Sequence, residues 1–171
     1  MAKNKTRAII ECSRCHEKVS PDEIEVIDGE QLCHHCLYGG LKPFKIYPIG
    51  FVRNNLKRAR TGFGTDGDRS SSCIELLDSQ RPFLYRIEEE DHLTIVYYFH
   101  ESGGVRSVFR RGLDGKKVGV FSSRTPYRLS RIAIQDVRLL KVEGNKLFVE
   151  GLDAVNGSPV LDIKMKWNSK E

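Results

Sequence analysis

Short apolar runs separated by turn-forming residues dominate the chain from Lys45 onward. The clearest run covers residues 93–99, Leu-Thr-Ile-Val-Tyr-Tyr-Phe, and is rich in the β-branched and aromatic residues that favour strands. The other predicted strands cover residues 46–53, 73–77, 118–122, 132–142, 146–152 and 160–164. Seven short strands with such spacers favour a closed or nearly closed barrel. We therefore predict a mainly β fold built around a small antiparallel β-barrel.

The same pattern predicts where the barrel departs from regular strands. Pro48 has no amide hydrogen and places the first strand at a sheet edge or a bulge. Within residues 132–142 the apolar residues Ile132 and Ile134 lie at even-numbered positions, whereas Val137 and Leu139 lie at odd-numbered positions. This change of phase predicts a β-bulge near residues 135–136. Residues 81–88 are predicted to form a short helix. Residues 58–72 are rich in Gly, Ser, Thr and Asp, and predict a long mobile loop.

Four of the five cysteines form two Cys-x-x-Cys pairs, Cys12 with Cys15 and Cys33 with Cys36. The 17 residues between the pairs match the spacing of a structural zinc site. Each pair presents two thiolates from a tight turn, and two such turns complete a closed tetrahedron around Zn²⁺. Such a site has no open coordination position, so we expect a structural role. Two alternatives remain: a redox-active dithiol pair, or a site in which a cysteine is replaced by His16, His34 or His35.

The predicted zinc ribbon is too short to bury a core of its own, so metal binding and folding should be one event. Ile24, Val26 and Ile27 precede an Asp28-Gly29 turn, which predicts a small hairpin within it. Cys73 is expected to be a half-buried core thiol. The predicted boundaries are residues 1–40 for the zinc ribbon, 41–44 for a hinge and 45–171 for the barrel domain.

The composition excludes several classes of protein. The 171 residues include 28 Lys and Arg, 23 Asp and Glu, and 39% hydrophobic residues, which is typical of a soluble globular chain. No run approaches the roughly 18 consecutive apolar residues of a membrane span. Residues 1–7 lack the apolar segment of a signal peptide. We therefore expect a cytoplasmic protein without membrane association, in which disulfides are disfavoured.

Positive charge is concentrated in residues 103–131, which carry eight basic residues and one acidic residue. Such a cluster can attract a polyanion through phosphate contacts and counterion release. On charge alone, a solvated basic loop is an equal alternative.

Two further polar segments suggest a binding site. Residues 119–128 read Gly-Val-Phe-Ser-Ser-Arg-Thr-Pro-Tyr-Arg, and residues 151–164 read Gly-Leu-Asp-Ala-Val-Asn-Gly-Ser-Pro-Val-Leu-Asp-Ile-Lys. Each is interpreted as a strand ending in a proline-containing loop, which suits a small-molecule pocket or, equally, a structural turn. The sequence contains no P-loop, no nucleophile elbow and no Rossmann fingerprint.

Together with residues 49–53, these two segments resemble the hallmark motifs of the TsaA/TrmO family of tRNA methyltransferases. The resemblance covers about residues 45–166. It implies a small β-barrel that binds S-adenosyl-L-methionine and acts as a homodimer. It also implies N6-methylation of a threonylcarbamoyl-adenosine beside the tRNA anticodon, so that the anticodon loop of tRNA would be the partner.

The resemblance further implies a set of cofactor contacts, which are His100, Glu101, Arg124, Val149, Asn156, Gly157, Ser158 and Pro159. It assigns no catalytic residue, and positioning of the methyl group in line with the amine lone pair can supply most of the rate. The prediction depends on Arg124 and the turn at residues 156–159 folding toward each other to form one pocket. Judged by residue type alone, His100 is an ordinary hydrogen-bonded histidine at a strand end.

The leading hypothesis is therefore a tRNA methyltransferase. In it, Arg124 and Arg128 bind the cofactor carboxylate or RNA phosphate, and Tyr127 stacks on an unpaired base. The zinc ribbon would add RNA or partner contacts. One alternative is a non-catalytic RNA-binding or cofactor-sensing protein on the same barrel, and another is a small-metabolite methyltransferase.

Overall fold

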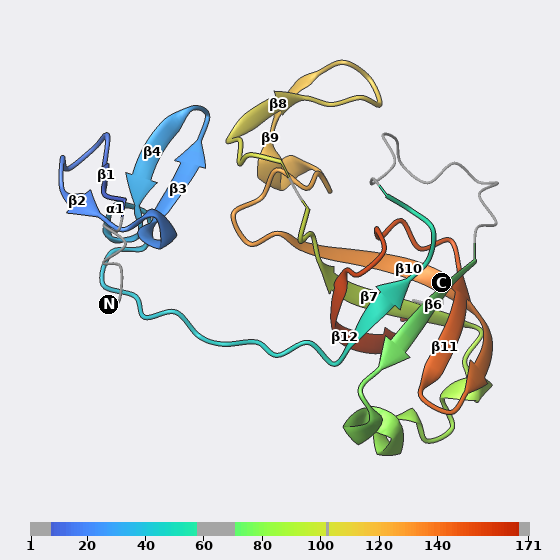
Figure 1. The fold of residues 1–171 in the computed structure, drawn as a ribbon. Helices are drawn as coiled ribbons and strands as arrows, with labels where there is room; N and C mark the ends of the chain where they lie inside the picture. Colours follow the sequence, from blue (N-terminus) through green and yellow to red (C-terminus); the bar gives the residue numbers. More distant parts are fainter. Residues whose placement is uncertain (1–7, 58–70, 102, 168–171) are drawn as a thin grey trace, which may run out of the picture.

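A computed structural model of the chain describes residues 8–57, 71–101 and 103–167 (Figure 1). It shows an N-terminal module, residues 8–40, joined to a β-barrel by a segment without helix or strand that runs to Gly50. Most of the predicted loop at residues 58–72 lies outside the described residues, and Ser71 and Ser72 belong to a strand. No described helix combines the length and hydropathy that a membrane span requires.

The N-terminal module consists of two antiparallel hairpins and one helical turn. β1 (Ile10–Glu11) pairs with β2 (Lys18–Val19), and β3 (Ile24–Ile27) pairs with β4 (Glu30–Cys33), before α1 (His34–Tyr38). A 3-10 turn, η1 (Pro21–Glu23), joins the hairpins. The predicted Asp28-Gly29 turn is confirmed: both residues have positive φ, +53° and +93°, which matches the twist of a two-residue hairpin.

Six strands close into an antiparallel barrel in the order β10-β11-β6-β5-β12-β7. Their bounds are β5 (Gly50–Arg53), β6 (Ser71–Leu76), β7 (His92–Tyr98), β10 (Ile132–Glu143), β11 (Lys146–Glu150) and β12 (Pro159–Met165). The predicted fold class is therefore confirmed.

Alternation along the strands fills the barrel with apolar side chains. In β7, Leu93, Ile95 and Tyr97 point inward and are almost fully buried, whereas their neighbours are partly exposed. The inward residues pack in one core with Ile74 and Leu147. Burial raises the pKa of the Tyr97 phenol, which stays protonated and donates a hydrogen bond to the Asp153 carbonyl.

An insertion between β7 and β10 leaves the barrel and forms a hairpin of its own. We call residues 103–131 the basic arm. It contains β8 (Val108–Arg110) paired with β9 (Lys117–Gly119), then the 3-10 turn η4 (Val120–Ser122). The prediction of a barrel strand at residues 118–122 is therefore wrong. The basic side chains around that short apolar run are costly to bury, so the segment remains outside the barrel.

The predicted bulge at residues 135–136 is also wrong. β10 pairs with β7 without interruption from Ile132 to Arg138, and its register shift against β11 lies between Leu139 and Lys141. The apparent change of phase arises because Ile134 faces outward, 56% exposed.

Two other elements differ from the predicted bounds. The first barrel strand begins at Gly50, after Pro48, because proline has no backbone N–H to donate to a neighbouring strand. The predicted helix at residues 81–88 is replaced by two 3-10 turns, η2 (Asp78–Leu84) and η3 (Ile87–Glu89).

Candidate functional site

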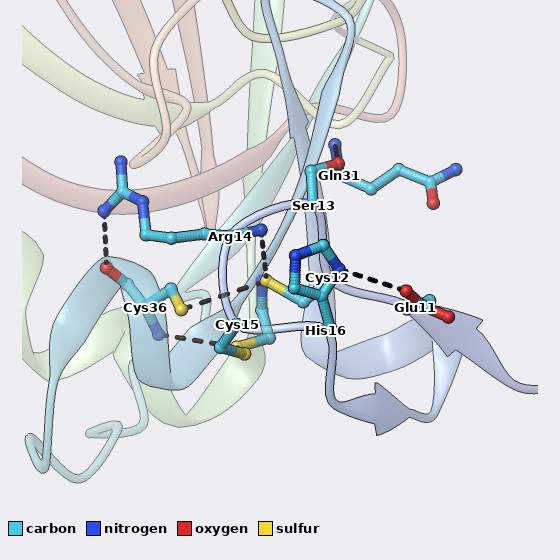
Figure 2. A network of polar contacts seen from close by, with 9 residues as sticks. Glu11, Cys12, Ser13, Arg14, Cys15, His16, Gln31 and Cys36 are labelled. Atoms are coloured by element: carbon cyan, nitrogen blue, oxygen red, sulfur yellow. Dashed lines mark hydrogen bonds and ion pairs between the residues drawn. The ribbon is translucent and has the colours of Figure 1, made fainter.

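The four paired cysteines meet in the N-terminal module (Figure 2). Cys12 and Cys15 lie in the turn between β1 and β2, Cys33 ends β4, and Cys36 lies in α1. Their four Sγ atoms all lie within 4.8 Å of one another. The Cys12 and Cys36 sulfurs are 3.8 Å apart, and those of Cys15 and Cys33 are 3.7 Å apart. The predicted ligand set is thus brought together.

The surroundings of the four sulfur atoms shift the thiol pKa values in opposite directions. Hydrogen bonds from backbone amides at Cys15 and Cys33 lower the pKa of Cys12 to about 6. Burial and the neighbouring thiols raise the pKa of Cys36 to about 12. Four adjacent thiolates repel one another, so they ionise together only when a cation compensates their charge.

This donor set fits a structural zinc ion. Among the described residues, the group of side chains placed so that it could hold a metal ion consists of the four cysteines and includes no histidine. His16 instead contacts the Glu11 carboxylate at 3.1 Å on the surface. All five cysteines are free thiols, so no disulfide competes with the metal. Four thiolates would hold Zn²⁺ as a cross-link between the two hairpins.

A second cluster lies where β7 ends and β12 begins. The buried Ser158 hydroxyl lies 3.3 Å from His100 Nδ1, and Nε2 of that ring lies 3.7 Å from a Glu101 carboxylate oxygen. Gly157 has a φ of +83°, which glycine adopts without strain, and a Cβ there would lie 3.8 Å from His100 Nε2. The fold therefore joins four of the predicted cofactor residues, although His100 and Ser158 are 58 positions apart.

Asn54, which follows β5, holds the turn at residues 154–158 in place. Its Nδ2 donates to Ser72 Oγ at 2.9 Å and to the Ala154 carbonyl at 2.8 Å. Its backbone amide donates to Asn156 Oδ1 at 3.1 Å. The predicted residue Asn156 is thus part of a fixed turn rather than a free loop.

Beside this turn lies a mostly apolar cavity of about 510 Å³. Pro159, another predicted cofactor residue, lines it together with Phe44, Ile46, Tyr98, Ile132 and Leu161. Phe44 and Ile46 belong to the segment that precedes the barrel. The other four residues lie on the outer face of β7, β10 and β12. A cavity of this size and lining suits a flat ring such as a purine.

The structure does not join the remaining two predicted residues to this cluster. Arg124 is exposed, and within the described residues no hydrogen bond or ion pair connects it to the turn at 156–159. Val149 is fully buried in the barrel core, where it pairs with Ser72 and Leu139. The cofactor roles of both residues stay predictions.

Sequence comparison decides the family. The model described as the tRNA-methyltransferase O N-terminal domain, TrmO_N, matches residues 62–169, which is more than half of the chain. The chain belongs to the TrmO N-terminal domain family.

Relatives of this TrmO-family chain include mammalian and archaeal proteins. The tRNA (adenine(37)-N6)-methyltransferase of Mus musculus is 40% identical over 102 residues, which are 56% of this chain and 24% of the mouse protein. The S-adenosyl-L-methionine-binding protein of Archaeoglobus fulgidus is 33% identical over 121 residues, 68% of this chain and 85% of that protein. The matched part thus spans about a quarter of the mouse relative.

The fold agrees with this assignment. The crystal structure of TrmO from Pseudomonas aeruginosa superposes with a TM-score of 0.60 and 25% sequence identity, covering 74% of this chain and 57% of that one.

The basic arm of this TrmO-family chain keeps an excess of positive charge. Arg111 pairs with Asp114 at 2.6 Å, and this guanidinium lowers the pKa of the Asp114 carboxyl. Arg106 lies over the Tyr127 ring at 4.7 Å. Within the described residues, neither Lys117 nor Arg124 makes an ion pair. The arm can therefore offer cations to an anionic partner.

Sequence reasoning missed two residues that shape the candidate site. Asn54 supports the turn as described above. Gln135 donates to the Gly151 carbonyl at 2.6 Å and accepts from the Asp153 amide at 2.9 Å. Gln135 lies at the inward-facing position between Ala133 and Val137, and a polar residue at that position was the available signal. Nothing near Asn54 in the sequence marks its distant partners.

Proposed function

We propose that this TrmO-family chain is an S-adenosyl-L-methionine-dependent methyltransferase. Its acceptor would be the N6 amine of a modified, threonylcarbamoyl adenosine beside the tRNA anticodon. The observation that carries the proposal is the joining of His100, Gly157 and Ser158 beside an apolar cavity at the end of the barrel. The names of the mouse tRNA (adenine(37)-N6)-methyltransferase and the Archaeoglobus S-adenosyl-L-methionine-binding protein support it.

The residues present fit such a cofactor. The apolar cavity at Pro159 would take the adenine ring, and the turn at residues 156–158 would offer backbone groups at its edge. Glu101, whose side chain is 60% exposed, would accept hydrogen bonds from hydroxyl or ammonium groups. The guanidinium of Arg124 would bind the methionyl carboxylate.

When bound, S-adenosyl-L-methionine supplies the methyl group. The N–C bond to the acceptor amine forms as the S–C bond breaks, and the amine loses one proton to solvent or to a tRNA group. We assign no catalytic base to the described residues. Their contribution would be to orient the two reactants and to exclude water, which can supply most of the rate.

The basic arm would hold the tRNA backbone. Lys117 is exposed and makes no ion pair within the described residues, so its charge is available to phosphates. Tyr127 already contacts Arg106 and Phe109, and any base would stack beside this group.

We further propose that the chain forms a homodimer through the outer face of β7 and β10. Ile134 and Leu140 place apolar surface on β10, and they are 56% and 45% exposed. Light scattering that gives the mass of a single chain at micromolar concentration would contradict this proposal.

Replacing Arg124 by alanine is expected to weaken S-adenosyl-L-methionine binding by roughly tenfold to a hundredfold, because a charged hydrogen bond to the cofactor carboxylate contributes roughly 1.5–3 kcal/mol. Calorimetry measures this directly. Arg86→Ala is the matched control, since Arg86 lies in the η2–η3 region and pairs only with Glu89 among the described residues. Equal S-adenosyl-L-methionine affinities for the two variants would show that Arg124 does not contact the cofactor.

Transfer of a labelled methyl group to bulk tRNA tests the proposed activity itself. We expect labelled N6-methylated adenosine after digestion, and no labelling of tRNA that lacks the threonylcarbamoyl group. Cofactor binding without transfer would instead support the sensing alternative, which the name of the Archaeoglobus relative favours because it states binding alone.

A further inference from the structure

The hairpin turn of the N-terminal module contacts the start of the basic arm. The Asp28 carboxylate accepts hydrogen bonds from the Ser107 backbone amide, at 3.1 Å, and from the Ser107 hydroxyl. The Asp28 amide donates to the Val105 carbonyl at 3.2 Å, and Ile27 forms a parallel bridge with Val105. In Figure 1 the β3–β4 turn faces β8 and β9. Two segments almost 80 residues apart are therefore joined by backbone and side-chain contacts.

The same hairpin also contacts the end of the arm. Glu25 pairs with Arg131 at 3.5 Å, and only 27% and 31% of the two side chains are exposed, so this pair is better shielded than an ordinary surface pair. Arg131 has a φ of +52° and its carbonyl accepts from the Phe99 amide at 2.8 Å, next to His100 of the candidate site. The module thus holds both ends of the arm.

The arm's own contacts are a short hairpin, a backbone hydrogen bond from Arg106 to Tyr127 and the packing of Tyr127 on Phe109, and the contacts of the module add to them. Its two strands have three residues each, and a hairpin of that size is not stable alone in water. Leu113 and Phe121 are 70% and 85% exposed, so they form no core. The Ser107 carbonyl accepts from the Val120 amide at 2.9 Å, which connects the Asp28 contact to η4 and the segment carrying Arg124.

The charge of the module argues against a direct role in phosphate binding. Residues 8–40 carry two basic and seven acidic residues, whereas the arm carries eight basic residues and one acidic residue. Two of those acidic residues, Glu25 and Asp28, face the arm. The negative charge of the module is therefore complementary to the positive charge of the arm and not to the negatively charged RNA backbone.

We infer that the N-terminal module is a positioning element for the basic arm, and that Glu25 and Asp28 are its positioning residues. Metal held by the four cysteines would order the β3–β4 hairpin, and the hairpin would order the arm for tRNA. The inference rests on the proposed function only where it concerns tRNA. Whether the module orders the arm is measured separately, by amide hydrogen exchange.

The test uses the full chain with Glu25→Gln and Asp28→Asn combined. Asparagine tolerates the positive φ at position 28, so the turn is kept while the charge is lost. We expect amide hydrogen exchange in residues 105–131 to accelerate about tenfold, and tRNA affinity to fall by a similar factor. Zinc content should not change. Glu30→Gln is the control, because Glu30 lies on the same hairpin without an ion pair among the described residues.

Unchanged exchange in the arm would overturn the inference. Faster exchange with unchanged tRNA affinity would support the positioning role and contradict the RNA role of the arm. Ser107→Ala tests the same contact from the arm and should also accelerate exchange. If that variant has no effect and the double variant has lost its zinc, unfolding of the module explains the result and the positioning role is wrong.

Chelation of the metal gives a second readout. Removing zinc from the wild-type chain should accelerate exchange in residues 105–131 as the double variant does, and should leave the barrel strands protected. An arm that keeps its protection without metal would overturn the inference.

Discussion

Replacing Cys33 by serine should abolish metal binding and unfold residues 8–40, with the barrel still folded. Cys33 is 2% exposed and belongs to a buried core of three residues with Cys12 and Leu32, which is too small to stabilise the module without metal. Serine supplies no thiolate, so zinc content should fall from about one per chain to about zero. Metal analysis and amide exchange in the module measure the two effects.

Cys73→Ser is the matched control. Cys73 lies in β6, outside the cluster, and is half-buried as expected from the sequence, so zinc content should not change. Retention of zinc by the Cys33 variant would mean that a neighbouring histidine completes the site, and the closed four-thiolate arrangement would then be wrong.

Replacing Gly50 by alanine should destabilise the barrel by about 3 kcal/mol or more, because overpacking against backbone cannot be relieved by a rotamer change. A Cβ at this position would lie 2.5 Å from the Glu75 carbonyl oxygen and 2.7 Å from the Leu76 Cα. Gly50 pairs with both neighbouring strands, so a shift away from β6 would disturb its pairing with β12. Denaturant unfolding followed by fluorescence of the barrel tyrosines measures the change.

Gly104→Ala provides the comparison. Nothing lies within 4 Å of a Cβ there and its φ is not in the left-handed region, so we expect a change of less than about 0.5 kcal/mol in the free energy of unfolding. If the two variants are equally stable, β5 and β6 approach each other less closely than described.

Several predictions from the sequence held because they depend on local chemistry. The spacing of the cysteines was sufficient to predict their meeting, since each pair is a single turn. The Asp28-Gly29 turn set the register of the first predicted hairpin. The run at residues 93–99 became β7 because its alternation and β-branched residues suit a half-buried strand. The family motifs likewise placed the barrel and the turn at residues 156–159.

The errors came from residues whose surroundings are supplied by distant segments. The change of phase predicted a bulge, whereas it arises because Ile134 lies on the outer face of the barrel. The apolar run at residues 118–122 was taken for a barrel strand, although its partner is β8.

By itself, then, the sequence determined the type of each module, the cluster of four cysteines and most of the strands, because these follow from neighbours a few positions apart. Only the tertiary structure decided that Asn54 supports the turn at residues 154–158, that Arg124 stands apart from it, and that Glu25 meets Arg131. The physical reason is that these contacts join residues about 100 positions apart, and their geometry is defined only once the barrel has closed.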